Sequence, residues 1–326
     1  MKCTWYVTDC TDPYENLARE ELLFSQIQPG EILLYLWQND NTVVIGRNQN
    51  AWRECRLETF SAQNGRLARR LSGGGAVYHD MGNQNFTFIA PHDLYDVECQ
   101  TEVIRLAVNA FGINAERSGR NDIQADSKKF SGNAFHRGKD AAFHHGTILI
   151  SSDMGRLSKF LAPSPEKLEA KGVKSVRARV INLAELNPDI TPKGIRAAIL
   201  DAFDKVYGVA PQPLNPSRID PEKLKQLTAR YADDDWRLGR MSEFDYSFRR
   251  RFSFGELEFH FSVQNGNITE ARVYSDAMDA LWVKELENSL ASTPFNTAAL
   301  AAAVPNNSQS EDDAAEVADF FREMTL

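Results

Sequence analysis

The chain has 326 residues, enough for one large domain or two, and 42% hydrophobic with 25% charged residues is the composition of a folded globular protein. Its formal net charge of −8 argues against bulk binding of nucleic acid, so any basic patch must be local. The four cysteines show no metal-binding spacing, no apolar run reaches membrane-spanning length, and the N-terminus lacks a signal-peptide core. We therefore expect a cytoplasmic protein without a membrane segment.

The first sixty residues predict a strand, a helix, a strand hairpin and a second helix. The predicted segments are 3–8 (strand), 13 to about 29 (helix), 32–37 and 42–45 (hairpin strands) and 52–63 (helix). Pro13 suits a first helical position because proline has no N–H and the helix needs no N–H donor there. Glu20 and Glu21 lie late in this helix, and we expect both to be solvated.

Residues 66–80 carry the most unusual pattern of the chain, in which three consecutive glycines, Gly73 to Gly75, follow Arg69 and Arg70. Backbone amides in such a turn are unshielded and can point together at an anion, and guanidinium forks suit phosphate or carboxylate. We expect a strand, a glycine loop with an anionic ligand over it, and a second strand. A sharp hairpin with incidental surface arginines is the alternative. The spacing fits neither a P-loop nor a dinucleotide-binding fingerprint.

The middle of the chain predicts further strands and helices, with Gly112 and Gly208 as the ends of two of the helices. They are strands at 85–90 and 142–150 and helices at 97–111, 157–161, 165–171, 192–207 and 221–231. His144 and His145 are adjacent on a strand and should point to opposite faces, which makes them poor partners for one metal ion. The basic segment 171–179 is either a solvated loop or a patch that faces an acidic partner or a phosphate.

The last eighty or so residues change in character. Residues 247–273 alternate between apolar and polar side chains around Asn265-Gly266-Asn267, which predicts an antiparallel hairpin with one buried face. Three helix-like stretches follow, the last over 312–324. We therefore expect a catalytic domain over 1–240 and a small α+β accessory domain over 241–326.

Motifs in a fixed order run along nearly the whole chain. They are Asn16-Leu17-Ala18-x-Glu20-Glu21, Val43-Val44-Ile45-Gly46-Arg47, Gly119-Arg120-Asn121-Asp122, Lys129-x-Ser131-Gly132, His144-His145-Gly146-Thr147 and Ser175-Val176-Arg177. At their centre stands Arg69-Arg70-x-Ser72-Gly73-Gly74-Gly75-Ala76-Val77-x-His79-Asp80-x-Gly82-Asn83. In these motifs the sequence resembles the lipoate–protein ligase A family. The resemblance implies an α+β fold: a catalytic domain like that of biotin protein ligases, with a mixed, largely antiparallel sheet and flanking helices, plus a small α+β C-terminal domain.

The same resemblance implies two reactions. Lipoate, with octanoate as an alternative acid, reacts with ATP and Mg²⁺ to give an acyl-adenylate and pyrophosphate. The acyl group then passes to a lysine ε-amine on lipoyl domains of 2-oxoacid dehydrogenase E2 subunits or on the glycine-cleavage H protein. We also expect a monomer, although the sequence itself does not determine the oligomeric state.

Site residues follow from the matched motifs, with Lys129 as the catalytic residue. The implied ATP contacts are Arg70, Gly75, Ala76, Val77, Tyr78 and Lys129. The implied lipoate contacts are Lys129, Arg70, Gly74, Gly75 and His79. Asn83, Asp122 and Ser131 are candidates for phosphate or magnesium contacts or for supporting them, and Asp122 is the candidate metal ligand. Asn83 and Asp122 could instead stabilise turns. The alternative interpretation of Lys129 is a solvated lysine on the surface.

The chemistry agrees with these residues, because a carboxylate that attacks an α-phosphate is an anion meeting an anion and needs fixed cations and amides. Three other functions stay open. An ATP-independent lipoyl or octanoyl transferase of the same fold is the nearest, although no cysteine nucleophile follows Cys99. A biotin ligase and a non-catalytic lipoate- or nucleotide-binding protein are the others.

Overall fold

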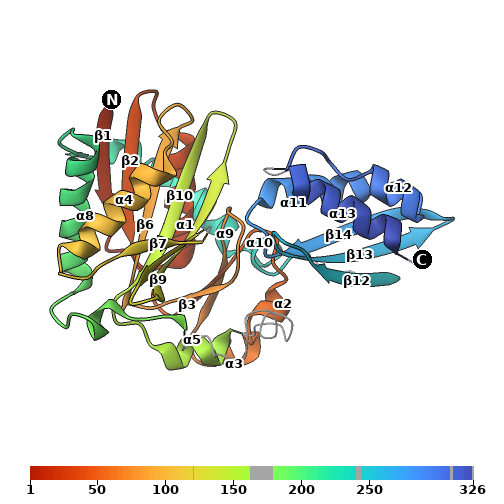
Figure 1. Cartoon of the computed structure of the whole chain (residues 1–326), viewed down its shortest axis with the longest axis horizontal. Helices are drawn as coiled ribbons and strands as arrows, with labels where there is room; N and C mark the ends of the chain where they lie inside the picture. The colour runs from red at the N-terminus through yellow and green to blue at the C-terminus, as the bar shows by residue number, and fades with distance from the viewer. Residues whose placement is uncertain (120, 162–178, 240–243, 309–310, 325–326) are drawn as a thin grey trace. The chain divides into compact units, whose positions relative to one another are not determined.

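The structure is a computed structural model that describes residues 1–119, 121–161, 179–239, 244–308 and 311–324 (Figure 1). The chain forms two compact units. The first contains Met1–Val44, Trp52–Ala68 and Val77–Arg237, and the second contains Ile45–Ala51, Arg69–Ala76 and Leu238–Leu326. Two short segments from the first quarter of the chain thus belong to the second unit. The predicted helix at 165–171 and most of the basic segment 171–179 lie outside the described residues.

An eight-stranded mixed sheet organises the first unit (Figure 1). Its order is β11 (Gln212–Pro213), β1 (Lys2–Val7), β2 (Glu31–Trp37), β6 (Asn83–Pro91), β10 (Ala141–Leu149), β9 (Lys128–Arg137), β8 (Asp122–Ala125) and β7 (Glu116–Ser118). β1 runs parallel to β2 and β11, and the other described pairings are antiparallel. The predicted mixed sheet is confirmed.

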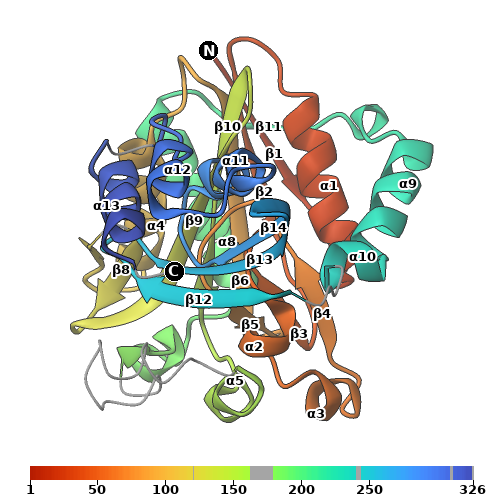
Figure 2. The ribbon, with the colours of Figure 1, turned by 90° about the vertical axis from the view of Figure 1, so that its right-hand side faces the viewer.

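Helices cover both faces of this sheet. The helices of this part of the chain are α1 (Pro13–Ser25), α2 (Ala51–Glu54), α3 (Leu57–Ser61), α4 (Val97–Asn109), α5 (Met154–Phe160), α8 (Pro192–Tyr207), α9 (Pro221–Ala232) and α10 (Asp234–Arg237). α4 and α8 bury the apolar core on one face, where Leu34, Phe86 and Phe88 meet Ile104 and Phe203. α1 lies over the other face and packs against α9 (Figure 2).

The helix starts predicted at prolines are confirmed, because each has its cap. Asp12 accepts hydrogen bonds from the amides of the first turn of α1, Thr191 does so for α8, and Asp220 for α9. Gly208 ends α8 in the left-handed conformation, with φ of 64°.

The predicted hairpin of 32–37 with 42–45 is wrong. β2 pairs with β1 and β6, whereas β3 (Thr42–Ile45) belongs to a separate sheet of order β4-β3-β5, with β4 at Arg66–Arg69 and β5 at Val77–His79. The connection redirects the chain because the Asn16 side chain donates to the carbonyl of Gln38 and to the side chain of Asn39. The predicted helix at 52–63 is interrupted as well, since Cys55 forms a bridge with Leu161 between α2 and α3.

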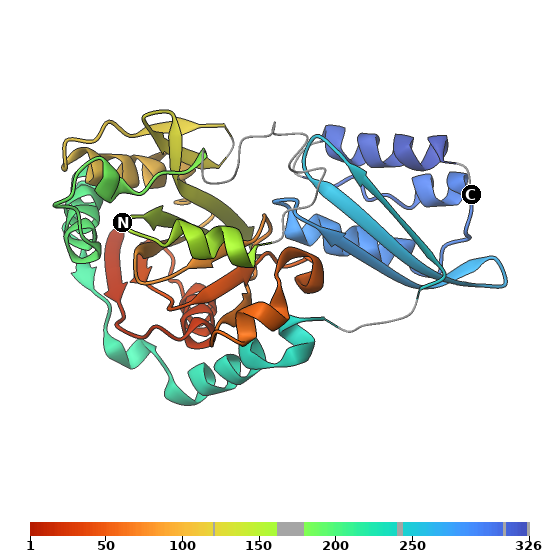
Figure 3. The same ribbon diagram turned by 90° about the horizontal axis from the view of Figure 1, so that it is seen from below.

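The second unit contains an antiparallel sheet of β12 (Tyr246–Arg251), β13 (Glu256–Gln264) and β14 (Asn267–Ser275) (Figure 3). The predicted turn is confirmed, with positive φ at Asn265 (52°) and Gly266 (74°). The helices α11 (Ala280–Leu290), α12 (Thr297–Ala302) and α13 (Glu311–Glu323) follow, and their apolar sides enclose Phe259 and Phe261. The predicted α+β fold with a small C-terminal α+β part is therefore confirmed. No helix in the described ranges is long and apolar enough to cross a membrane.

Candidate active site

Lys129 projects from the second strand of the tight β8–β9 hairpin. The turn of this hairpin places Asp126 and Ser127 at φ of 50° and 59°, and the register shifts between Ile123 and Gln124. The Nζ atom of Lys129 lies 2.6 Å from Oδ1 of Asp122, and about a third of each side chain is exposed (33% and 32%). The hairpin thus gives Lys129 a fixed partner, which a simple surface lysine lacks.

Gly132 lies directly beneath the Lys129 side chain. A Cβ atom at position 132 would come within 2.8 Å of both Cε and Nζ of Lys129. Asp122 and Gly132 are register partners across the two strands, so these three residues form one patch on the hairpin. Ser131 is fully buried and accepts a 3.5 Å hydrogen bond from Asn133, which places it in a supporting position.

Arg70 organises the glycine loop in the second unit. Its Nε donates to Ser72 Oγ at 3.0 Å, and its Nη2 donates to the carbonyls of Gly73 (2.7 Å) and Gly75 (2.8 Å). Gly74 has φ of 88°, a conformation that favours glycine. The loop curls around a buried guanidinium, and its residues 75–77 remain at least partly accessible to a ligand.

Arg69 has a different role from Arg70. Its Nη1 donates to the carbonyls of Gly46, Arg47 and Gln49, which ties the segment 45–51 to the end of β4. Burial lowers the pKa of Arg69 to about 10, so the guanidinium keeps its charge at neutral pH. The described donor bonds of Arg69 go to backbone oxygens, so this guanidinium holds the segment 45–51 in place.

Two glycines of this unit are required by close backbone approach. A Cβ at Gly46 would lie 2.2 Å from the carbonyl oxygen of Gly74, and a Cβ at Gly73 would lie 2.2 Å from that of Ala277. The Gly74 amide also donates to the Ala277 carbonyl at 3.0 Å. Gly46 and Gly73 are thus needed for close packing, a role that was not predicted from the sequence.

The remaining predicted residues are mostly buried in the first unit. The Tyr78 ring packs against Phe60 and Phe160, so a nucleotide contact at this position would have to involve its backbone. The Nδ1 atom of His79 lies 3.2 Å from Nδ2 of Asn39 and 3.5 Å from that of Asn85. The Asn83 side chain donates to Asn85 Oδ1, so the structure brings His79 and Asn83 into one buried cluster.

Comparison with known proteins identifies the family of the chain. Residues 12–204 match the family described as Lipoyl protein ligase A/B catalytic domain, and residues 241–321 match the family described as Bacterial lipoate protein ligase C-terminus. Lipoate-protein ligase A of Psychrobacter cryohalolentis is 42% identical over 304 residues, which is 91% of this chain and 90% of the relative. The chain belongs to the lipoate–protein ligase A family.

Solved structures agree with this assignment. P. falciparum LipL1 in complex with lipoate has a TM-score of 0.87 and 29% identity, and the match covers 98% of this chain and 99% of that one. A lipoate-protein ligase A bound with ATP (TM-score 0.65, 25% identity) covers 74% of this chain and 100% of its own. The bi-partite Thermoplasma acidophilum lipoate protein ligase, described with its E2 lipoyl domain, has a TM-score of 0.65 and 26% identity, with 76% and 100% coverage.

A buried polar cluster lies beneath α1 of this ligase and was not predicted from the sequence. Glu20 is 1% exposed, so its predicted solvated position is wrong. Its Oε1 accepts from Thr87 Oγ1 at 2.7 Å and lies 2.8 Å from His145 Nδ1, and Trp37 Nε1 donates to the same Thr87 hydroxyl. The helical spacing of Asn16 and Glu20 would have revealed the shared buried face.

Histidines of the ligase do not form a metal site in the described residues. His144 and His145 point to opposite faces as predicted, with His144 held between Gln100 and Asn133. Burial lowers the pKa of His144 to about 3, which keeps this ring neutral. Within the described ranges, no group of three or more His, Cys, Asp or Glu side chains is arranged to hold a metal ion.

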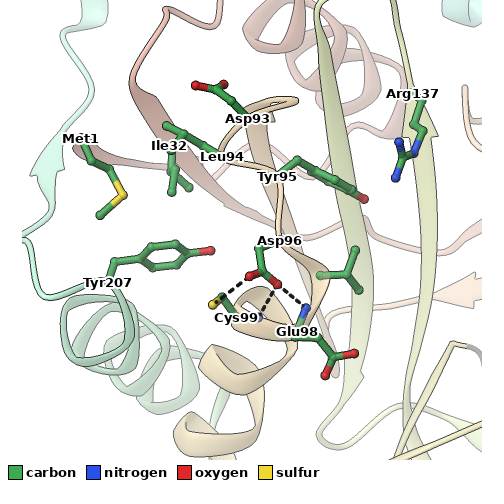
Figure 4. A pocket seen from close by; sticks show the side chains of 11 residues that line it. Met1, Ile32, Asp93, Leu94, Tyr95, Asp96, Glu98, Cys99, Arg137 and Tyr207 are labelled. Carbon is green, nitrogen blue, oxygen red and sulfur yellow. Dashed lines mark hydrogen bonds between the residues drawn. The ribbon is translucent and has the colours of Figure 1, made fainter.

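A cavity of about 510 Å³ lies elsewhere in the first unit of the ligase (Figure 4). Its lining includes Tyr95, Cys99, Arg137 and Tyr207, together with Asp96, but none of the predicted site residues. Asp96 caps α4 by accepting from the amides of the first turn and from the Cys99 thiol. Asp96 thus serves a helix start, and because none of the predicted site residues lines this cavity we do not place the active site there.

Proposed function

We propose that this member of the family activates lipoate with ATP to lipoyl-adenylate and then transfers the lipoyl group to a lysine of an acceptor protein. The observation that carries the proposal is the Lys129–Asp122 pair, which holds the ammonium of the family's site lysine in a defined place on a hairpin. The matches to both the catalytic and the C-terminal family descriptions support a complete ligase.

In the first step a carboxylate oxygen of lipoate attacks the α-phosphorus of ATP, and the bond to the leaving pyrophosphate breaks. Both reactants are anionic, so a fixed cation lowers the barrier where their charges meet. The ammonium of Lys129 supplies this charge. No nucleophilic side chain is needed because the substrate carboxylate is itself the nucleophile.

In the second step the neutral ε-amine of the acceptor lysine attacks the acyl carbon of lipoyl-adenylate. The bond from that carbon to the adenylate oxygen breaks, AMP leaves with its electron pair, the attacking nitrogen loses one proton to water, and an amide forms. Negative charge develops on the leaving phosphate, where a retained ammonium at Lys129 again favours the transition state.

Further site residues belong to the proposal. Nucleotide contacts are assigned to Arg70, Gly75, Ala76, Val77, the backbone of Tyr78 and Lys129, and lipoate contacts to Lys129, Arg70, Gly74, Gly75 and His79. The partial exposure of residues 75–77 supports the nucleotide assignment. Asn83 and Ser131 are assigned supporting roles because both are buried beside other polar groups.

Magnesium does not fit a resident site made of the described residues, since these present no cluster of three ligands. We propose that it enters with the triphosphate of ATP, where it would neutralise phosphate charge. Lipoyl domains of 2-oxoacid dehydrogenase E2 subunits and the glycine-cleavage H protein are the proposed acceptors, and the Thermoplasma acidophilum ligase with its E2 lipoyl domain supports the first of these. A cytoplasmic monomer remains part of the proposal, supported in its location by four free thiols.

The test is pyrophosphate release by the purified chain with ATP and lipoate, with octanoate and biotin as alternative acids. We expect release with lipoate and none with biotin, followed by a lipoyl mass increase on an added lipoyl domain. Transfer from supplied lipoyl-adenylate without any pyrophosphate release from ATP would instead indicate an ATP-independent transferase. Binding of lipoate without either reaction would contradict the proposal altogether.

A further inference from the structure

The β8–β9 hairpin brings three residues of different kinds onto one patch. Asp122 starts β8, Gly132 is its register partner on β9, and Lys129 lies three residues before Gly132 on the same strand. The register shift and the two left-handed turn residues curl the hairpin, so that the Lys129 side chain lies back across Gly132. The Lys129 ammonium reaches Asp122 as a result.

The partner of the ammonium is well defined. Oδ1 of Asp122 is shielded from solvent and accepts no hydrogen bond from the described residues, and Nζ of Lys129 lies 2.6 Å from it as its ion-pair partner. A lysine side chain has many rotamers, and fixing it in one place costs free energy unless specific contacts restrict it. The Asp122 carboxylate on one side of the Lys129 side chain and Gly132 beneath it restrict the side chain in this way.

We propose that Asp122 and Gly132 are positioning residues for Lys129, an inference that rests on the proposed function. The ammonium has three N–H donors. The ion pair with Asp122 holds the ammonium in one place, where its N–H donors can reach the lipoate carboxylate and the α-phosphate. Gly132 keeps clear the space in which the end of the side chain lies.

This assignment differs from the magnesium role expected for Asp122. A side chain that positions the lysine needs an oxygen facing the ammonium but not a metal-binding charge. Asn supplies such an oxygen with the same shape, whereas it is a weaker ligand for magnesium. Asp122→Asn therefore separates the two roles, and Asp122→Ala removes both.

Gly132→Ala provides a second test that does not depend on charge. Gly132 does not have a positive φ, so alanine suits its backbone. The new Cβ would meet the end of the Lys129 side chain at 2.8 Å, and its next contact is an ordinary one of 3.9 Å to Thr147 Oγ1. Since the end of a lysine side chain can swing away, the protein should fold normally with a displaced ammonium.

The experiment measures the rates of both half-reactions, the KM for ATP, the magnesium dependence and the thermal midpoint of each variant. We expect Asp122→Ala to lower kcat for adenylation by about tenfold, because it removes the charged partner that holds the lysine in place. We expect Gly132→Ala to lower it by about a hundredfold, the cost of misplacing a catalytic group by about 1 Å. Asp122→Asn should restore most of the rate with an unchanged magnesium titration.

The matched control for Gly132→Ala is Gly194→Ala in α8, where the nearest atoms to a new Cβ belong to the side chains of Thr191 and Phe111 and where we expect wild-type rates. Wild-type kcat in both Asp122→Ala and Gly132→Ala would overturn the inference, as would a shifted magnesium titration in Asp122→Asn. Failure of the proposed function looks different, because the wild-type chain itself would then release no pyrophosphate with ATP and lipoate.

Discussion

Lys129 and Lys128 are neighbours in sequence, yet the hairpin gives them different surroundings. Lys128 is exposed, whereas the ammonium of Lys129 is held 2.6 Å from Asp122. An ammonium fixed in advance needs no reorganisation when charge develops on the substrates, and this is the condition under which electrostatic stabilisation is strongest.

Lys129→Ala should therefore lower the rate of adenylation by about 10²–10³, the usual effect of removing one such donor. Transfer from supplied lipoyl-adenylate should also slow. Lys129→Arg should restore only part of the activity, because a planar fork does not replace a compact charge over Gly132. Pre-steady-state rates of both half-reactions are the measurement, with Lys128→Ala as the matched control. Near-normal rates in folded Lys129→Ala would show that the site is misassigned.

His144 makes the stability of the ligase depend on pH. In the unfolded chain its pKa is near 6.5, while burial lowers the folded value to about 3. Between these values the unfolded state binds more protons, so the free energy of unfolding should fall as the pH falls from 6.5 towards 3, by at most about 1.4 kcal/mol per pH unit from this group. Urea unfolding of wild type and His144→Gln at a series of pH values measures the effect.

The variant should show a shallower decline over this range, although it is less stable at neutral pH because it alters contacts with Gln100 and Asn133. His92→Gln, at an exposed histidine, should leave the decline unchanged. Equal slopes for His144→Gln and wild type would assign the acid sensitivity to other groups.

At the scale of elements, the sequence predicted what local rules determine. Asp12-Pro13 and the run from Thr191 to Gly208 each carry their own start or stop signal, and the structure confirms them. The failed hairpin shows the limit of such rules. β2 and β3 are separated by a turn-like sequence, but β2 pairs with β6, and a residue pattern does not reveal which distant strand will compete for an edge.

The glycine loop leads to a prediction with an internal control. A Cβ at Gly73 would meet the backbone oxygens of Ala277 and Met278 at 2.2 and 2.5 Å, whereas a Cβ at Gly75 has nothing within 4 Å. Gly73→Ala should therefore destabilise the second unit by about 1–3 kcal/mol through overpacking. Gly75→Ala should leave stability unchanged while it raises the KM for ATP, because its methyl group would stand where the proposed nucleotide approaches the backbone.

Thermal unfolding together with ATP kinetics measures both variants. A stable Gly73→Ala would mean that the loop can withdraw from Ala277 without cost. A Gly75→Ala variant with unaltered ATP kinetics would remove this residue from the nucleotide contacts.

At the scale of the whole molecule, the α+β class and the small C-terminal sheet were predictable from hydrophobic periodicity and the matched motifs. The composition of the second unit was not. Residues 45–51 and 69–76 join a body built from residues more than 160 positions later in the chain. Such contacts depend on single backbone groups, such as the Asn48 carbonyl that accepts from the Ser275 amide, and these leave no periodic signal in a sequence.

This arrangement predicts that the C-terminal residues support the glycine loop. In a fragment of residues 1–239 the Gly74 amide loses its acceptor at Ala277, and the Asn48 side chain loses its bond to the Ala280 carbonyl. We expect amide exchange at Gly74 to be faster in the fragment than in the full chain, because local opening then costs less. The fragment should also have a higher KM for ATP in the adenylation reaction. The amides of β6, in the core of the first unit, are the control and should exchange equally slowly in both proteins. Equal protection of Gly74 in fragment and full chain would show that the loop keeps its structure without the C-terminal residues.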